Sequence, residues 1–183
     1  SVLAHYPPSA LGLQNMSSVS PKGSKVSSEQ KARQEFLIGI DFGETHSSVG
    51  IFQNGKAEII ANDQGQYSTP SVVSVLQSGE ALVGDSAVAK AASNRKNTLF
   101  GLKNLLGRVY DDEETQALLA TLPYTCEPDT SMNPPEISVV LEVGEPTPRP
   151  VAVPVPELVA HVLKALRQAA EAYAGLRVTA AAL

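Results

Sequence analysis

The chain has 183 residues, of which 43% are apolar and 18% charged, and its formal net charge is -5 at pH 7. This composition suffices for one hydrophobic core with a small additional lobe, and because no run approaches the roughly 18 apolar residues of a membrane-spanning helix, the body is expected to be soluble. The negative charge argues against nucleic acid as the main partner, and the single cysteine, Cys126, excludes a disulfide framework or a multi-cysteine zinc site and is interpreted as an unreactive thiol.

Residues 1–34 differ in composition from the rest of the chain. They are rich in serine, lack hydrophobic periodicity and carry more basic than acidic side chains. This composition predicts a disordered leader that precedes a folded part at residues 35–183. An organelle transit peptide is the alternative interpretation of the leader, and Met16 is an alternative start of translation.

The folded part is expected to open with a three-stranded antiparallel meander. A short apolar run from Phe36 to Asp41 predicts a buried strand that delivers a carboxylate to a turn. Strands at residues 47–52 and 57–60 follow, and the Asn54-Gly55 dipeptide between them favours a type I′ hairpin. The first turn of this meander is unusually rich in small and hydroxyl residues.

The middle of the chain is predicted to hold short elements. A strand is expected at residues 71–76. Three helices should follow, at residues 85–92 with Asp85 as the N-cap, at 98–106 and at 111–122. A proline-rich segment then surrounds one alternating run at residues 137–143, which is interpreted as an edge strand in a loop-rich lobe.

A long amphipathic helix is the clearest element of the C-terminal part. Pro156 suits its first turn, Gly175 suits its end, and His161 falls beside the apolar stripe, where we interpret it as a helix-surface residue. The residues from Val178 onward are apolar and have no polar stop, which predicts a strand cut short and a truncated domain.

The segment from Asp41 to Ser48 has the strongest chemical character. A carboxylate at a strand end, a glycine turn with exposed backbone N–H groups, and hydroxyls together suit a magnesium-bound phosphate. The alternative is a tight hairpin in which Asp41 and Thr45 satisfy the turn's own backbone. Neither a G-x-x-x-x-G-K-[ST] loop nor a G-x-G-x-x-G motif is present.

A series of ordered motifs resembles the opening of the seventy-kilodalton heat-shock protein family. The resemblance covers about residues 36–183, is dense up to Arg108 and is sparse between Tyr110 and Pro156. The matching motifs are residues 37–43, 47–56, 58–65, 69–71, 83–85, 97–100, Lys103 with 105–108, and 170–175.

This resemblance implies an α/β fold of the actin-like, ribonuclease-H-like ATPase type, of which residues 35–183 would form the first lobe only. The parent protein would be a molecular chaperone that uses ATP or ADP with Mg²⁺, and ATP hydrolysis would control its binding of unfolded or nascent polypeptides. Its cochaperones would be a J-domain protein and a nucleotide-exchange factor, with neither nucleic acid nor membrane as a partner. The fragment alone is expected to be inactive, and its location cytoplasmic, or in an organelle if the leader is a transit peptide.

The resemblance also assigns residues one by one. Asp41 would hold magnesium through water and take part in catalysis, and Gly43, Glu44 and Thr45 would form the first phosphate loop with His46 beside them. Lys103 would reach the γ-phosphate and the attacking water, where a compact ammonium can offset charge that develops on a phosphoryl oxygen. Without the resemblance, Lys103 reads as an ordinary exposed helix lysine.

Two residues depart from the family pattern. Glu44 stands where the family has a threonine, and two like charges about 4 Å apart repel by roughly 4 kcal/mol at an effective dielectric constant near 20. Tyr67 stands where the family usually has a basic residue. Unless Glu44 faces solvent or binds the metal, it favours the alternative of a divergent, weakly or non-hydrolysing cochaperone of the ribosome-associated type that acts as a structural partner. A sugar kinase or actin relative is disfavoured by the block from Asn62 to Pro70.

Overall fold

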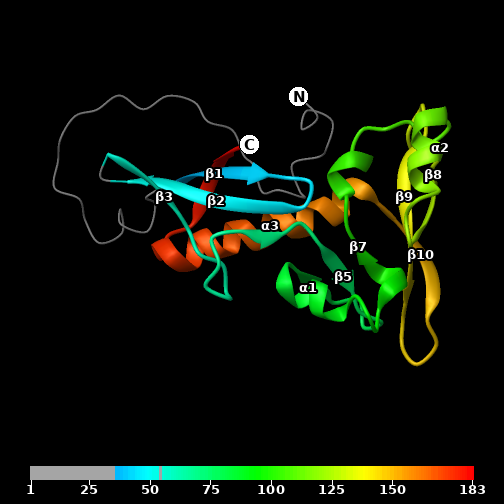
Figure 1. Cartoon of the computed structure of the whole chain (residues 1–183), viewed down its shortest axis with the longest axis horizontal. Coiled ribbons are helices and arrows are strands. Elements are labelled where there is room, and N and C mark those ends of the chain that lie inside the picture. The colour runs from blue at the N-terminus through cyan, green and yellow to red at the C-terminus, as the bar shows by residue number, and fades with distance from the viewer. Residues whose placement is uncertain (1–35, 54) are drawn as a thin grey trace.

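The computed structural model describes residues 36–53 and 55–183, so the predicted leader and the Asn54 position of the hairpin lie outside the described residues. The described strands form three sheets, one of five strands and two of three strands each. A long helix, α3, runs beneath the first of these and toward the third (Figure 1). Among the described residues, no helix combines the length and apolar character needed to cross a bilayer.

The predicted meander is confirmed. Strands β1 (Phe36–Phe42), β2 (His46–Gln53) and β3 (Lys56–Ile59) pair in antiparallel succession. Side chains alternate along β1, so that Ile38, Ile40 and Phe42 are buried while Asp41 is exposed. One face of this sheet is therefore part of the core, and the end of β1 presents a carboxylate outside it.

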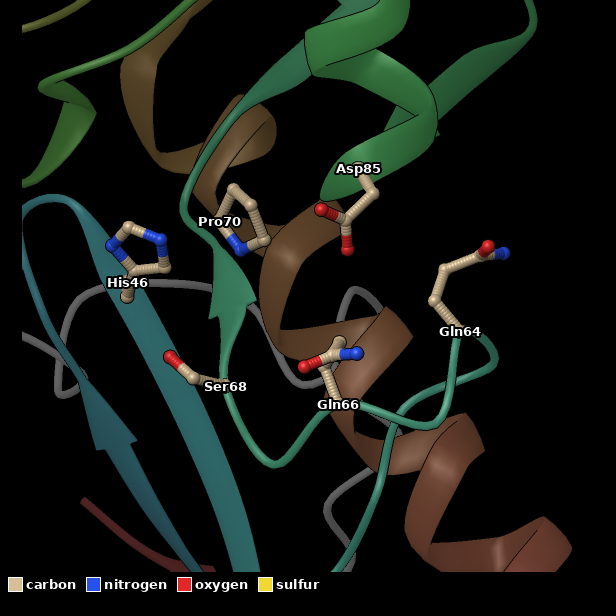
Figure 2. A pocket seen from close by; sticks show the side chains of 6 residues that line it. All are labelled: His46, Gln64, Gln66, Ser68, Pro70 and Asp85. Atoms are coloured by element: carbon tan, nitrogen blue, oxygen red, sulfur yellow. The ribbon is translucent and has the colours of Figure 1, made fainter.

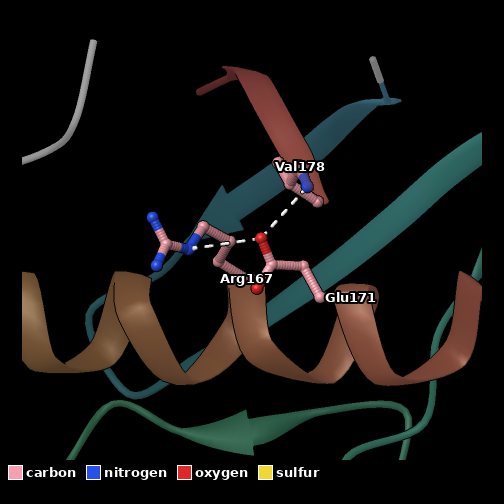
Figure 3. Close-up of polar contacts among 3 residues, drawn as sticks. All are labelled: Arg167, Glu171 and Val178. Atoms are coloured by element: carbon pink, nitrogen blue, oxygen red, sulfur yellow. Dashed lines mark hydrogen bonds and ion pairs between the residues drawn. The ribbon is translucent and has the colours of Figure 1, made fainter. Parts of the chain in front are cut away.

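Helix α3 (Val155–Ala174) covers the buried face of this sheet and leads into strand β11 (Val178–Ala182), which pairs in parallel with β1. Its predicted ends are confirmed, since a proline occupies its first turn and Gly175 follows it with a left-handed φ of 64°. The Val178 N–H donates to the Glu171 carboxylate at 3.0 Å, and Arg167 Nε lies 3.8 Å from the same oxygen (Figure 3). The helix end is thereby tied to the strand that follows it.

The chain segment of the second sheet includes a helix whose N-cap differs from the prediction. It contains β5 (Val73–Val75), β6 (Ala81–Val83) and β7 (Thr98–Leu99), while β4 (Thr69–Pro70) pairs with β2. Helix α1 (Asp85–Lys90) begins at Asp85, so the N-cap is Gly84 and Asp85 is wrong in that role.

The helix predicted at residues 98–106 is also wrong. Strand β7 occupies its start, and a 3₁₀ helix, η4 (Leu102–Leu105), occupies its end. Gly101 between them has a left-handed φ of 67°, which an α-helix does not permit. Leu99 on β7 and Leu102 and Leu105 on η4 are all buried, so two short elements together give the leucines a spacing close to that of one helix.

The third sheet and a short helix form the part of the chain from Glu113 to Pro154. Helix α2 (Glu113–Leu119) is shorter than predicted, and β8 (Thr125–Asp129) and β10 (Arg149–Pro154) flank β9 (Glu136–Val143). The prediction that residues 137–143 form an edge strand is therefore wrong, because β9 is the central strand of this sheet. The prolines that fall within strands, Pro128 in β8 and Pro150 and Pro154 in β10, lie on the edge strands, where a missing N–H removes no ladder bond on the outer side.

Asn97 joins the second sheet to the third. It closes a 3₁₀ helix, η3 (Arg95–Asn97), and is 2% exposed. Its Nδ2 donates to the carbonyl oxygens of Val75 and Glu142 at 3.1 and 2.9 Å, and its Oδ1 accepts from the Glu142 N–H at 2.9 Å. The pairing of β9 with β8 ends at Val140, so the Asn97 amide takes the place of a strand partner for Glu142.

Candidate functional site

The turn between β1 and β2 has a backbone shape that requires glycine. A Cβ atom at Gly43 would collide with the carbonyl oxygen of His46, which is backbone and cannot move aside as a flexible side chain would. The requirement therefore comes from close approach of two backbone segments. Residue 43 cannot carry a side chain while the turn keeps this shape.

Two buried serines support the turn from the core side. The Ser71 hydroxyl donates to the Gly43 carbonyl oxygen at 2.9 Å, and the Ser71 N–H donates to the Thr45 carbonyl oxygen at 2.8 Å. The Ser47 and Ser71 hydroxyls lie 2.8 Å apart and share a further hydrogen bond. The sequence did not predict a role for Ser71, and its signal was only its place in the motif at residues 69–71.

Lys103 lies at the same turn although it is 61 residues away from Phe42 in the chain. Its Nζ donates to the Phe42 carbonyl oxygen at 2.7 Å and lies 5.8 Å from the centroid of the Phe42 ring. An ammonium has three donors, so after this bond two remain for another acceptor. The structure thus brings the predicted lysine and the predicted loop together.

Glu44 is exposed and does not extend freely into solvent. Its Oε1 accepts a hydrogen bond of 2.7 Å from the side-chain amide of Asn104, the residue that follows Lys103 on η4. The sequence did not predict Asn104 as part of the site. A contact across 60 residues between an exposed carboxylate and the amide of a partly buried asparagine leaves no periodic or compositional signal.

The other predicted residues lie around the turn. Asp41 is exposed on β1 opposite Ser48, and Thr45 is exposed at the start of the return. His46 is the first residue of β2 and lines a shallow pocket between that strand, the loop before β4 and the start of α1 (Figure 2). The pocket is lined by His46, Gln64, Gln66, Ser68, Pro70 and Asp85. His46 therefore lies beside the turn, as its position in the sequence indicates.

A second concavity, of about 650 Å³, lies between α3 and the segment that leads from β3 to β4. Tyr67 and His161 both line it. Burial lowers the pKa of His161, which is half-buried on the helix, close to the predicted helix-surface position. Tyr173 at its edge donates to the Glu58 carboxylate at 2.8 Å, and this bond raises the Tyr173 pKa. Tyr67 thus belongs to a surface separate from the turn.

Cys126 lies on β8 and is partly buried. Burial raises the pKa of its thiol to about 11, so the thiolate is scarce at neutral pH. The structure supports the prediction of an unreactive thiol.

The family model described as Hsp70 protein matches residues 37–183, which extends from the second residue of β1 through β11 to the last residue given. The match includes the β1–β2 turn, Lys103 and the whole of α3.

Proposed function

Because the chain belongs to the Hsp70 family, we propose that residues 35–183 form the first lobe of an actin-like, ribonuclease-H-like nucleotide-binding domain, and that the β1–β2 turn binds the phosphates of ATP or ADP. The observation that carries the proposal is the Lys103 ammonium, held at the turn by its bond to the Phe42 carbonyl oxygen. The exposed Thr45 hydroxyl and the backbone N–H groups of a glycine turn are further donors suited to phosphate oxygens.

Magnesium fits the donors at this turn. Asp41 is an exposed carboxylate at the end of β1, and Mg²⁺ is commonly held by one or two carboxylates together with phosphates and waters. Among residues 36–53 and 55–183, no group of three or more His, Cys, Asp or Glu side chains is arranged to hold a metal by itself. Asp41 would hold the ion through water, and the bound ion would offset phosphate charge.

The family supports a chaperone-type function for the chain. We propose the finer activity from the residues at the turn: ATP hydrolysis, with Lys103 and Asp41 in catalytic roles, controls binding of unfolded or nascent polypeptides by the full-length protein. A J-domain protein and a nucleotide-exchange factor would be its cochaperones, the cytoplasm its location, and residues 1–34 a leader outside the domain.

A specific observation favours a second candidate function. The Glu44 carboxylate is fixed at the proposed phosphate loop by Asn104, so the loop carries an anion where the ligand is anionic. A divergent cochaperone that binds nucleotide weakly or does not hydrolyse it, and acts as a structural partner, would tolerate this charge. ATPase rates of the full-length wild type and of Glu44→Thr separate the two candidates: an already robust rate that does not change removes the case for degeneracy.

The binding proposal is tested with Lys103→Met, which keeps the length of the side chain and removes its charge. Loss of a charge-assisted hydrogen bond is worth about 1.5 to 3 kcal/mol, so the affinity of the full-length protein for a non-hydrolysable MgATP analogue, measured by calorimetric titration, should fall on the order of tenfold to a hundredfold. Gly43→Ala should also lower it, because the Cβ forces the turn to change shape. Lys96→Met on the exposed side of η3 is the matched control. Unchanged affinity in a folded Lys103→Met protein would refute the proposal.

A further inference from the structure

Two successive residues of η4 contact the β1–β2 turn. Lys103 donates to the Phe42 carbonyl oxygen, and Asn104 donates to the Glu44 carboxylate, each at 2.7 Å. Because the same 3₁₀ helix supplies both contacts, the ammonium and the carboxylate lie at the same turn. Glu44 is thus restrained although its side chain is exposed.

The charges at this turn do not cancel through direct contact. The Lys103 ammonium and the Glu44 carboxylate do not form an ion pair, since the pair found within 4.0 Å among the described residues is Arg167–Glu171. Lys103 contacts Phe42, two residues before Glu44, so an anion bound by Lys103 at this turn would also interact with the separate Glu44 carboxylate. The repulsion grows with each negative charge on the ligand, and exposure to water limits its size.

We propose that Glu44 is a specificity-determining residue that disfavours the terminal phosphate of a nucleoside triphosphate relative to a diphosphate, and that Asn104 is the positioning residue that holds its carboxylate at the turn. This inference rests on the proposed nucleotide site. It gives the Glu44–Asn104 pair a role in the choice between ATP and ADP. The fold of the turn does not depend on this pair, because the turn is held through hydrogen bonds to its backbone groups.

The decisive variant is Glu44→Gln. The glutamine has nearly the same size, and its amide oxygen can still accept the Asn104 hydrogen bond, so the charge alone is removed. Calorimetric titration of the full-length protein with MgATP and MgADP should show the ATP-to-ADP affinity ratio rising on the order of tenfold, because one charge interaction across a partly screened site is worth about one decade. Higher salt should shrink the difference between wild type and variant.

Asn104→Ala tests the positioning role. It leaves the Glu44 charge but frees the side chain, so the affinity ratio should move in the same direction by a smaller factor. In the Glu44→Gln background the same change should leave the ratio unaltered, since no carboxylate remains to be positioned. A merely structural role for Asn104 would instead change the two affinities by equal factors in both backgrounds.

The outcomes separate this inference from the proposal beneath it. Binding of both nucleotides with an unchanged ratio in Glu44→Gln overturns the inference and leaves the nucleotide site standing. Failure of the folded wild type and the folded Glu44→Gln protein to bind either nucleotide overturns the nucleotide site, and the inference with it. Thermal melts of each protein establish that it is folded.

Discussion

Asn97 offers the sharpest test of how the sheets are held together. In Asn97→Ala, both backbone groups of Glu142 lose their side-chain partner. The Val75 carbonyl oxygen loses one of two side-chain donors and keeps the bond of 2.9 Å from Asn94 Nδ2. Asn97 is 2% exposed, so water cannot readily replace the amide, although Glu142 itself is only partly buried. Three hydrogen bonds at about 1 kcal/mol each predict a loss of roughly 3 kcal/mol in the free energy of unfolding.

The loss is large beside the total stability of about 5 to 15 kcal/mol that is typical of folded proteins. Urea unfolding followed by circular dichroism measures it, and the melting temperature should fall by roughly 6 to 12 °C. Asn104→Ala is the matched control, because it removes one exposed hydrogen bond and should cost less than about 1 kcal/mol. An Asn97→Ala protein within about 0.5 kcal/mol of wild type would refute the view that this amide acts as a strand partner.

Two further predictions concern the junction between α3 and β11 and the Cys126 thiol. Glu171→Gln should lower the free energy of unfolding by about 1 kcal/mol, because the Val178 N–H then has a weaker acceptor and Arg167 loses its charge partner. Urea unfolding measures this loss, and an equal loss in the exposed control variant Glu157→Gln would contradict the explanation. The raised pKa of Cys126, from 9.0 to about 11, means that the unfolded chain releases the thiol proton first, so stability should fall as pH rises from 9 toward 11. Labelling of the thiol should be slow in the folded protein at pH 8 and fast in protein unfolded by denaturant. Rapid labelling of the folded protein would contradict the burial of Cys126.

The elements that the sequence predicts correctly are those whose evidence is local. The β1–β3 meander follows from period-two burial and short turns, and α3 follows from a long apolar stripe with a proline and Gly175 at its ends. The segment from Thr98 to Leu106 fails for a physical reason. Two short buried elements on either side of Gly101 produce the same leucine spacing as one helix.

The proline-rich part shows a different limit. Proline marks an edge strand, and the structure places prolines in β8 and β10, which are edges. The error was to assign the edge to the strand between them, because strand order depends on pairing that composition does not encode.

The candidate site shows the same division between local features, which the sequence predicts, and long-range contacts, which it does not. Asp41, Gly43 and Thr45 lie in one local motif, whereas Ser71 and Asn104 contribute through hydrogen bonds across 28 and 60 residues.

The contacts of the β1–β2 turn explain why residue 44 can vary without loss of the fold. The turn is held through the carbonyl oxygens of Phe42, Gly43 and Thr45, whose partners are Lys103 and Ser71. None of these bonds uses the side chain at position 44, so a carboxylate there alters the charge of the turn and leaves its shape intact. Lys103 differs, since its one ammonium both supports the backbone and faces the proposed ligand. Glu44→Gln should therefore melt close to wild type while it changes nucleotide choice, whereas Lys103→Met should affect stability and binding together.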